Sequence, residues 1–238
     1  MFTTPLVIAT LVAATLGAAV GFLTSRRKTR ATIARLRDEL ADTMWQLNHD
    51  PLTGLHNRTG LRTIHTAVAA SAEHRQIVAV LIDLDLFKEV NDTFGHDAGD
   101  DLLKATGSRV ARLAALYSGK AARLSGDEFA VIAPLDTARL DHMALLFTSV
   151  IAEPVKVRTD KGPVAVTITA SLGIAVASST DLLEGVALHH ADTAMYHAKQ
   201  QGGNRHVLHR PGMTMPGHPT RRGPRLRDRR RTQNGSGA

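Results

Sequence analysis

The first long pattern in the chain is an uncharged, mostly apolar run over residues 5–23. As a helix it would span roughly 28 Å at about 1.5 Å per residue, close to a hydrocarbon core about 30 Å thick. Basic residues follow it at 26–30 and none precedes it, so the positive-inside rule places the rest of the chain in the cytoplasm. We therefore predict a single-pass anchor, residues 1–24, in the inner (cytoplasmic) membrane. The alternative is a cleaved signal peptide, but the basic start typical of such peptides is missing.

Residues 25–48 alternate charged residues with apolar ones at coiled-coil spacing. The apolar stripe consists of Ile33, Leu36, Leu40 and Leu47, with Met44 and Trp45 beside it. This spacing predicts an amphipathic helix that continues the apolar run. The helix either acts as a spacer or brings two copies of the chain together.

From residue 49 to residue 209 the pattern changes to short strands and helices, because Asp50-Pro51 disfavours continuation of the helix. A continuous apolar run over 76–83 predicts a buried strand. The other predicted elements are helices over 98–116, 137–152 and 186–201, two strands in 120–133 around a turn at Ser125-Gly126, two strands in 154–176 joined by the turn Thr159–Gly162, and a last strand over 205–209. Hairpins interleaved with helices predict an α+β domain with helices packed on a sheet.

Composition limits the chemistry that this domain can perform. Hydrophobic residues make up 43% of the chain and aromatic residues only 4%, so the core must be built mainly from aliphatic side chains and Ala. The chain has no Cys, so a metal would need oxygen or imidazole ligands.

The net charge of +7 does not indicate a nucleic-acid-binding domain, because the segment from Arg210 onward, with eight Arg and one acid, carries the whole excess. We predict that this segment, residues 210–238, is a disordered tail. Its arginines have the chemistry to contact anionic lipid or RNA, and a solvated tail is the simpler interpretation.

The predicted strand over 76–83 ends in Asp83. A carboxylate at the end of a buried strand is costly unless a partner neutralises it. With no thiol or histidine cluster nearby, a divalent metal is the usual partner, and Mg²⁺ prefers one or two carboxylates plus phosphate oxygens.

A second acidic group follows the turn Ser125-Gly126, where Asp127 and Glu128 are adjacent. If this hairpin lies beside the strand that ends at Asp83, then Asp83 and Asp127 can share two metal ions that clamp a phosphoryl group. Taken alone, the turn would be interpreted as an exposed polar hairpin.

Asn91 and Asp100 flank a glycine turn between two helical patterns. A carboxylate accepts hydrogen bonds from the ring N–H and the amino group of guanine, and an amide serves its O6 or N7 atom. Lys88 and Lys199 would supply positive charge for a triphosphate.

Four sequence blocks together resemble the GGDEF domains of diguanylate cyclases, in the order and spacing of that family. They are DPLTGLHNR at 50–58, IDLDLFKEVNDTFGHDAGDDLL at 82–103, RLSGDEFAVI at 123–132 and ADTAMYHAK at 191–199. The resemblance covers essentially the whole predicted domain, 49–209. Each block alone is a weak signal, and the four together are specific.

The resemblance implies a palm-like fold, with a central antiparallel-rich sheet flanked by helices, preceded here by the predicted transmembrane helix. It implies a homodimer that condenses two GTP molecules into cyclic di-GMP and two pyrophosphates, with one GTP bound to each subunit. Two Mg²⁺ (or Mn²⁺) ions would be held by Asp83, the carbonyl of Leu84 and Asp127. By position, the guanine and ribose site would be Asn91, His96 and Asp100, and the triphosphate site Leu86, Phe87, Lys88 and Lys199. Asp127 or Glu128 would help to deprotonate the attacking 3′-hydroxyl.

Three departures from the family pattern bear on activity. Ser125 replaces the first signature glycine, and its side chain would crowd the α-phosphate, or strain the turn if positive φ is needed. Gly203 stands where the family often has a phosphate-contacting Arg. Leu116 and Gly119 stand where the family's product-inhibition motif has Arg and Asp, so we expect no feedback inhibition there. The alternative function is a degenerate GGDEF module that binds GTP or protein partners without turnover.

Overall fold

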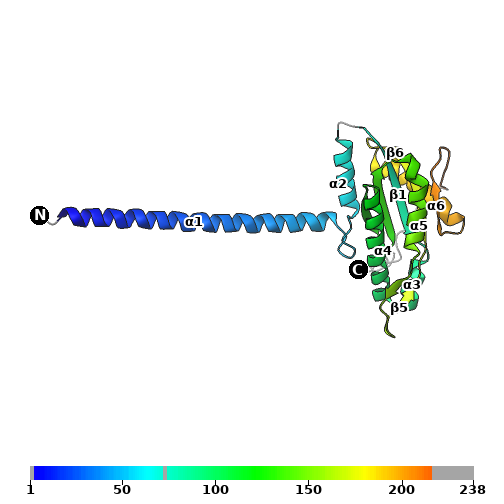
Figure 1. Ribbon diagram of the computed structural model, residues 1–238, viewed down its shortest axis with the longest axis horizontal. Coiled ribbons are helices and arrows are strands. Elements are labelled where there is room, and N and C mark those ends of the chain that lie inside the picture. The colour runs from blue at the N-terminus through cyan, green and yellow to red at the C-terminus, as the bar shows by residue number, and fades with distance from the viewer. Residues whose placement is uncertain (1–2, 72–73, 216–238) are drawn as a thin grey trace, which may run out of the picture.

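The computed structural model describes residues 3–71 and 74–215. Its first element, α1 (Thr3–Asn48), is one unbroken helix that projects away from a globular domain (Figure 1). Among the residues that the structure describes, no helix is long and apolar enough to cross a membrane. The predicted transmembrane span over 5–23 is therefore not supported, and most side chains of that range lie outside the described residues.

The globular domain is built on a five-stranded sheet with the strand order β2-β3-β1-β6-β7. Its strands are β1 (Gln76–Leu84), β2 (Lys120–Ser125), β3 (Glu128–Pro134), β6 (Ala170–Ser178) and β7 (Arg205–Leu208). Neighbouring strands are antiparallel except for β6 and β7, which are parallel. The central strand β1 is buried on both faces, which explains its continuous apolar sequence.

Helices cover both faces of the sheet (Figure 1). They are α2 (Arg58–Ala69), α3 (Phe87–Phe94), α4 (His96–Leu116), α5 (Leu140–Ile151) and α6 (Leu188–Gln200), with short helical segments at Thr137–Arg139 and Leu183–Ala187. A separate two-stranded sheet consists of β4 (Val155–Val157) and β5 (Val164–Val166). The domain is the palm-like α+β fold that the sequence predicted, with a mixed sheet flanked by helices.

Alternate residues of β1 point to two different hydrophobic cores. Val78, Val80 and Ile82 pack with α4 and α5 on what we call the α4/α5 face of the sheet. Ile77 and Leu81 pack with α2 and α6 on the opposite, α2/α6 face. By the same alternation, Asp83 belongs to the α2/α6 face.

Helix α2 was not predicted from the sequence. Its start is capped by Asn57, whose side chain accepts a hydrogen bond of 2.9 Å from the backbone N–H of Gly60. Leu61, Ile64 and Val68 follow at helical spacing, so the signal was present and was overlooked. The strand prediction over 154–176 was also incomplete, because this range forms three strands, β4, β5 and β6.

The C-terminal end of α1 is fastened to the start of α2. The ring of His49 stacks on Trp45 with centroids 4.8 Å apart and lies 4.5 Å from the ring of His56. The side-chain amide of Asn57 donates to the carbonyls of Leu47 (2.9 Å) and His49 (3.2 Å). These contacts hold the long helix at a defined orientation to the domain.

Candidate active site

The candidate site lies where β1 and β3 meet at one end of the sheet. Asp83 on β1 pairs in register with Glu128 on β3 and with Ser171 on β6. The hairpin around Ser125-Gly126, called here the signature turn, therefore lies beside the strand ending at Asp83, which is the condition that a shared metal site required. Since directly opposed residues share a face of the sheet, Asp83 and Glu128 both lie on the α2/α6 face.

Lys199 is the cationic partner of this acidic group. Its Nζ atom lies 2.8 Å from Oδ2 of Asp83, and the Asp83 side chain is only 13% exposed. Lys199 belongs to the last turn of α6, a helix that approaches the sheet closely at Gly173. A Cβ atom at Gly173 would overlap the backbone of Ala191 and Met195, so only glycine permits this approach. The small residue in β6 thereby brings Lys199 within reach of Asp83.

Negative charge exceeds positive charge around Asp83. Burial raises the pKa of Asp83, the hydrogen bond and charge of Lys199 lower it, and the charges of Asp127 and Glu128 raise it further. The net result is a pKa above the ordinary value for an aspartate. Burial contributes most to this rise, and the charges of Asp127 and Glu128 add to it against the single charge of Lys199, so further positive charge would stabilise the ionised form of Asp83.

The donor set at this end of β1 suits Mg²⁺. The backbone N–H of Leu84 donates to the carbonyl of Asp127 at 3.3 Å, which holds the predicted metal-binding residues Asp83, Leu84 and Asp127 next to one another. Within residues 3–71 and 74–215 no group of three or more His, Asp or Glu side chains could by itself hold a metal ion. Two carboxylates and a carbonyl leave the remaining positions for substrate oxygens and water, which is how Mg²⁺ is commonly bound beside phosphates. The residues present therefore fit the ion.

The signature turn is open and unstrained at Ser125. Gly126, not Ser125, takes the positive φ (+38°), and a Cβ atom there would meet nothing within 4 Å. The concern that Ser125 strains the turn is therefore wrong. The Ser125 hydroxyl donates to Oε2 of Glu128 at 2.7 Å, so it engages one of the two candidate bases. Both Ser125 and Gly126 are exposed, which leaves room for a ligand above the turn.

The predicted triphosphate residues Leu86, Phe87 and Lys88 form the junction between β1 and α3. Leu86 has a left-handed backbone (φ +59°), which turns the chain sharply from the strand into the helix. The first backbone N–H groups of a helix have no intrahelical partner and point toward anions. Lys88 is exposed in this first turn. The junction therefore offers backbone donors and a lysine near Asp83.

The predicted guanine residues lie on α3 and α4. Asn91 packs against Gly99 so closely that a Cβ atom there would overlap its Oδ1 atom. This close contact packs α3 against the start of α4, the helix that carries Asp100. His96 is exposed and lines a different cavity of about 360 Å³, together with Phe94 and Arg158. The joint role of Asn91, His96 and Asp100 in binding guanine therefore stays a prediction.

Asp85 is a site residue that the sequence reasoning missed. Its carboxylate accepts hydrogen bonds from Thr169 (2.7 Å), Ser171 (2.6 Å) and the backbone N–H of Asn204 (2.9 Å). It thereby fixes the loop after α6 against the end of β1. The signal was its position directly after the strand that carries Asp83.

A second missed contact joins the start of the domain to the signature turn. Arg123 donates to both oxygens of Asp50 (3.1 and 3.2 Å), and its Nε donates to the carbonyl of Gly126 at 2.8 Å. Burial raises the pKa of Asp50, but hydrogen bonds from Thr53 and Arg123 outweigh it, and the net pKa is lowered. The residues are far apart in the sequence, so spacing gave no indication of this pair.

The missing arginine at Gly203 is not replaced by its neighbour. Gly203 has φ +69° and lies against Asp85, where an added Cβ would approach the carboxylate oxygens to 3.0 Å. Arg205 instead donates to the carbonyl of Gly203 at 3.0 Å and lies 3.5 Å from Gln201. Its guanidinium therefore contacts its own loop.

Comparison with protein families matches residues 47–205 to the model described as "Diguanylate cyclase, GGDEF domain". Diguanylate cyclase TpbB of Pseudomonas aeruginosa is 39% identical over 171 residues, which are 71% of this chain and 39% of that protein. Response regulator PleD of Caulobacter vibrioides is 32% identical over 198 residues, 76% of this chain and 41% of that protein. The chain thus spans about two fifths of the length of these relatives.

Solved structures show the same fold. The coiled coil and GGDEF domain of DgcB from Caulobacter crescentus, in complex with c-di-GMP, is 30% identical, with a TM-score of 0.66. It covers 78% of this chain and 98% of that chain. The isolated GGDEF domain of TpbB from Pseudomonas aeruginosa is 34% identical, with a TM-score of 0.58, covering 68% of this chain and 94% of that one.

Proposed function

This chain belongs to the GGDEF family of diguanylate cyclase domains, and from that premise we propose that it condenses two GTP molecules into cyclic di-GMP and two pyrophosphates. The observation that carries the proposal is the group of three carboxylates, Asp83, Asp127 and Glu128, beside Lys199 at the open signature turn. The turn leaves space for a ligand at Gly126, where a side chain would meet nothing.

Separate groups of residues would bind the triphosphate, recognise the guanine and accept the proton of the attacking hydroxyl. Lys199 and Lys88, with the backbone donors at the start of α3, bind the triphosphate. Asn91 and Asp100 recognise the guanine edge. Asp127 and Glu128 stand where the 3′-hydroxyl of the second nucleotide would approach, and one of them accepts its proton.

Asp83, Asp127 and the carbonyl of Leu84 would hold two Mg²⁺ ions. When bound, these ions supply positive charge to the phosphoryl oxygens and favour ionisation of the attacking hydroxyl. Mg²⁺ should also raise the unfolding midpoint of the chain, since it offsets the excess negative charge at Asp83. Differential scanning fluorimetry with and without Mg²⁺ measures this effect, which should be absent in Asp83→Asn.

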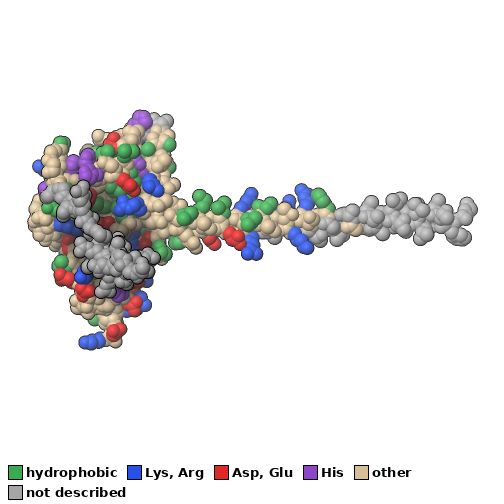
Figure 2. All heavy atoms as spheres, turned by 180° about the vertical axis from the view of Figure 1, so that it is seen from behind, with side chains coloured by type: hydrophobic (Ala, Val, Ile, Leu, Met, Phe, Trp, Pro, Cys, Tyr) green, Lys and Arg blue, Asp and Glu red, His purple; other side chains and the backbone are tan. Residues whose placement is uncertain are grey.

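Catalysis requires two domains to face each other, since each holds one GTP. We propose that α1 brings two copies together through its apolar stripe. Leu36, Leu40 and Leu47 are 57–63% exposed in the single chain. Figure 2 shows apolar side chains interspersed with charged ones along the described part of this helix. Sedimentation should show a dimer that the double variant Leu36→Glu/Leu40→Glu converts to a monomer, with loss of turnover.

The full-length chain incubated with GTP and Mg²⁺ should form cyclic di-GMP, detected by liquid chromatography. Asp127→Ala is the negative control. Absence of product from a verified dimer, at high protein concentration and with GTP bound, would contradict the proposal.

Ser125 is the residue whose substitution distinguishes an active cyclase from a module that binds GTP without turnover. The comparisons do not favour the alternative. The hydrogen bond from Ser125 to Glu128 is nevertheless a specific reason for slow turnover, because it occupies a carboxylate oxygen of a candidate base. Ser125→Gly removes this bond and should leave turnover unchanged or raise it several-fold. If wild type binds GTP without product and Ser125→Gly forms product, the alternative is correct for the natural chain.

Attachment to the inner membrane through residues 5–23 is a separate proposal. It is supported by the uncharged run and the basic residues that follow it. Fractionation after an alkaline carbonate wash should recover the full chain in the membrane pellet and a chain lacking residues 2–24 in the supernatant. Recovery of the full chain in the supernatant contradicts the proposal.

A further inference from the structure

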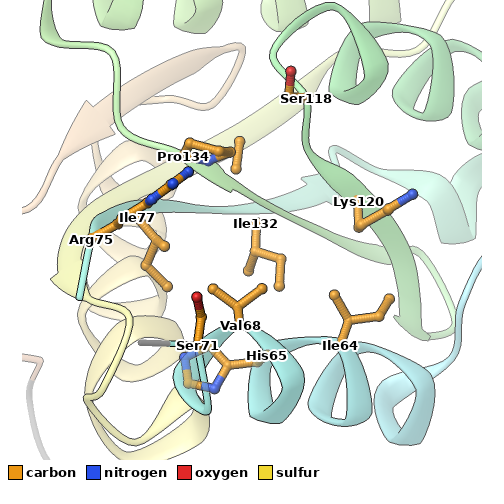
Figure 3. A pocket seen from close by; sticks show the side chains of 11 residues that line it. Ile64, His65, Val68, Ser71, Arg75, Ile77, Ser118, Lys120, Ile132 and Pro134 are labelled. Atoms are coloured by element: carbon orange, nitrogen blue, oxygen red, sulfur yellow. The ribbon is translucent and has the colours of Figure 1, made fainter. Parts of the chain in front are cut away.

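A pocket of about 320 Å³ lies between α2 and the sheet, at the opposite end of β3 from the signature turn (Figure 3). Ile64 and Val68 of α2 form one wall, and Ile77 of β1 and Ile132 of β3 form the other. This volume is at the lower end of the range for pockets that bind small molecules. The predicted catalytic residues do not line it.

One polar atom in this pocket has no partner. His65 is only 5% exposed, and its Nε2 atom is buried without a hydrogen bond. Burial lowers the pKa of His65, and the nearby charge of Asp181 only partly opposes this effect. The imidazole is therefore neutral near pH 7, and in one tautomer Nε2–H is a donor. Buried polar groups in native proteins are almost always hydrogen-bonded, so this atom calls for a partner.

The polar groups around the apolar walls are donors and cations. Lys120 and Arg75 lie toward opposite ends of the pocket in Figure 3, and Ser71 and Ser118 supply hydroxyl groups. None of the described residues that line the pocket is acidic. The lining thus combines an apolar centre with positive charge and hydrogen-bond donors at its ends.

We propose that this pocket binds a small amphipathic carboxylate, with its apolar body between Val68 and Ile132 and its carboxylate oxygen accepting a hydrogen bond from His65. The apolar centre excludes a strongly hydrated anion such as phosphate alone. Lys120, which carries positive charge at one end, and the neutral imidazole favour a carboxylate over an amine. The proposal is independent of cyclase activity, because no predicted catalytic residue takes part.

The pocket is connected to the signature turn through β2 and β3. Lys120 and Ile132 are paired in register, and β2 runs from Lys120 to Ser125, about 17 Å at 3.3 Å per residue. A ligand held between α2 and these strands would fasten α2, and with it the end of α1, to the sheet. Its binding free energy would then add to the stability of the folded domain.

The experiment measures thermal unfolding of the full-length chain with two carboxylates, octanoate and 3-phenylpropanoate. Their matched neutral compounds are octanol and 3-phenylpropanol. At about 100 times its Kd, a carboxylate should raise the unfolding midpoint by roughly 5–10 °C. The neutral compounds should raise it much less. No rise with either carboxylate overturns the proposal, and indicates that a water molecule satisfies His65.

Two variants of the pocket separate specific binding from general effects. Val68→Trp fills the pocket, and His65→Leu removes the hydrogen-bonding atom, and both should abolish the rise. Val164→Trp is the matched control, because Val164 and Val68 are both 38% exposed and Val164 lies outside the pocket. An equal rise in Val68→Trp and wild type overturns the proposal, even if His65→Leu fails to fold. A negative result for carboxylate binding does not bear on GTP turnover, so the two proposals are tested separately.

Discussion

The two faces of the sheet differ in the size of their side chains and in their chemistry. Of the described residues, the buried cluster on the α4/α5 face has six Ala among twenty-seven, and the cluster on the α2/α6 face has seven among fourteen. The largest fully buried side chains, Phe129 and Phe147, belong to the α4/α5 face. Asp83, Glu128 and Lys199 gather on the other face.

The difference shows how the fold separates stability from reactivity. Large side chains fill the α4/α5 face and supply most of the apolar burial. Small residues on the α2/α6 face, such as Gly173 in β6, let α6 approach the sheet closely. The close approach brings the lysine at the end of α6 to the aspartate at the end of β1. We therefore expect substitutions on the two faces to have separable effects on stability and turnover.

The largest effect on turnover should come from Asp83→Asn. The substitution keeps the side-chain shape and removes the charge that pairs with Lys199 and would hold the metal. We expect cyclic di-GMP formation to fall on the order of a thousandfold, as when one electrostatic partner of a transition state is removed. The initial rate at saturating GTP measures this effect. A circular dichroism spectrum like that of wild type excludes misfolding, and a rate within tenfold of wild type would contradict the role of Asp83.

The largest effect on stability should come from Phe147→Ala on the α4/α5 face. Phe147 is fully buried, and its truncation leaves a cavity that should lower the free energy of unfolding by about 3–5 kcal/mol. Urea denaturation followed by fluorescence or circular dichroism measures the change. Turnover below the unfolding transition should stay close to wild type. A large loss of turnover in fully folded protein would show that the two faces are not separable.

An intermediate effect on both properties should come from Gly173→Ala. The added methyl group would meet the backbone of Ala191 and Met195, so α6 must move away from the sheet. We expect a loss of about 1–3 kcal/mol in the free energy of unfolding and a lower turnover, because Lys199 moves with the helix. Gly185→Ala is the control, since its nearest contact would be an ordinary 3.5 Å to Leu182. Equal effects of the two variants would contradict the close-approach argument.

The smallest effect should come from the exposed ion pair of Asp101 and Arg158, away from both hydrophobic cores. Arg158 donates to Asp101 at 2.7 and 2.8 Å, and hydrogen bonds from Arg158 lower the pKa of Asp101 from 3.8 to about 2. A lowered carboxyl pKa stabilises the folded state at pH values above the ordinary pKa of an aspartate. This stabilisation is lost as the pH falls from about 4 toward 2. Asp101→Asn should lower the unfolding midpoint slightly at pH 7 and remove the part of its decline between pH 4 and 2 that this pair causes. Both effects should be small, because the Arg158 side chain is 70% exposed to solvent.

The sequence predicted the parts of the fold that local pattern encodes. The apolar run of β1, the hairpin at Gly126 and the helices α4, α5 and α6 all follow from periodicity and turn residues. The predicted metal site required that the hairpin at Ser125-Gly126 lie beside Asp83. The register of β1 and β3 meets this requirement. Family resemblance supplied the candidate roles of the side chains.

The remaining features depend on contacts between distant segments. The pair of Asp50 and Arg123 joins residues 73 positions apart, and no local pattern encodes such a contact. The role of Asp85 depends on hydrogen bonds from Thr169, Ser171 and Asn204, three positions that are brought together only by the sheet. The hydrogen bond of Ser125 to Glu128 depends on a side-chain rotamer. The first two are properties of tertiary structure, and the third is local but depends on side-chain geometry that the sequence does not give, so the effect of Ser125 could not be judged from the sequence.

The stacked rings of Trp45 and His49, the adjacent ring of His56 and the amide of Asn57 join α1 to the domain at a fixed angle. An α-helix turns by about 100° per residue, so the joint sets the rotational phase between the apolar stripe of α1 and the face that carries Asp83. Inserting one residue between Leu40 and Trp45 would turn the domain by about a quarter of a revolution relative to Ile33, Leu36 and Leu40, while seven residues would restore nearly the original direction. In the proposed dimer, the number of helix residues between the stripe and this joint would determine the direction in which the face that carries Asp83 points in each copy.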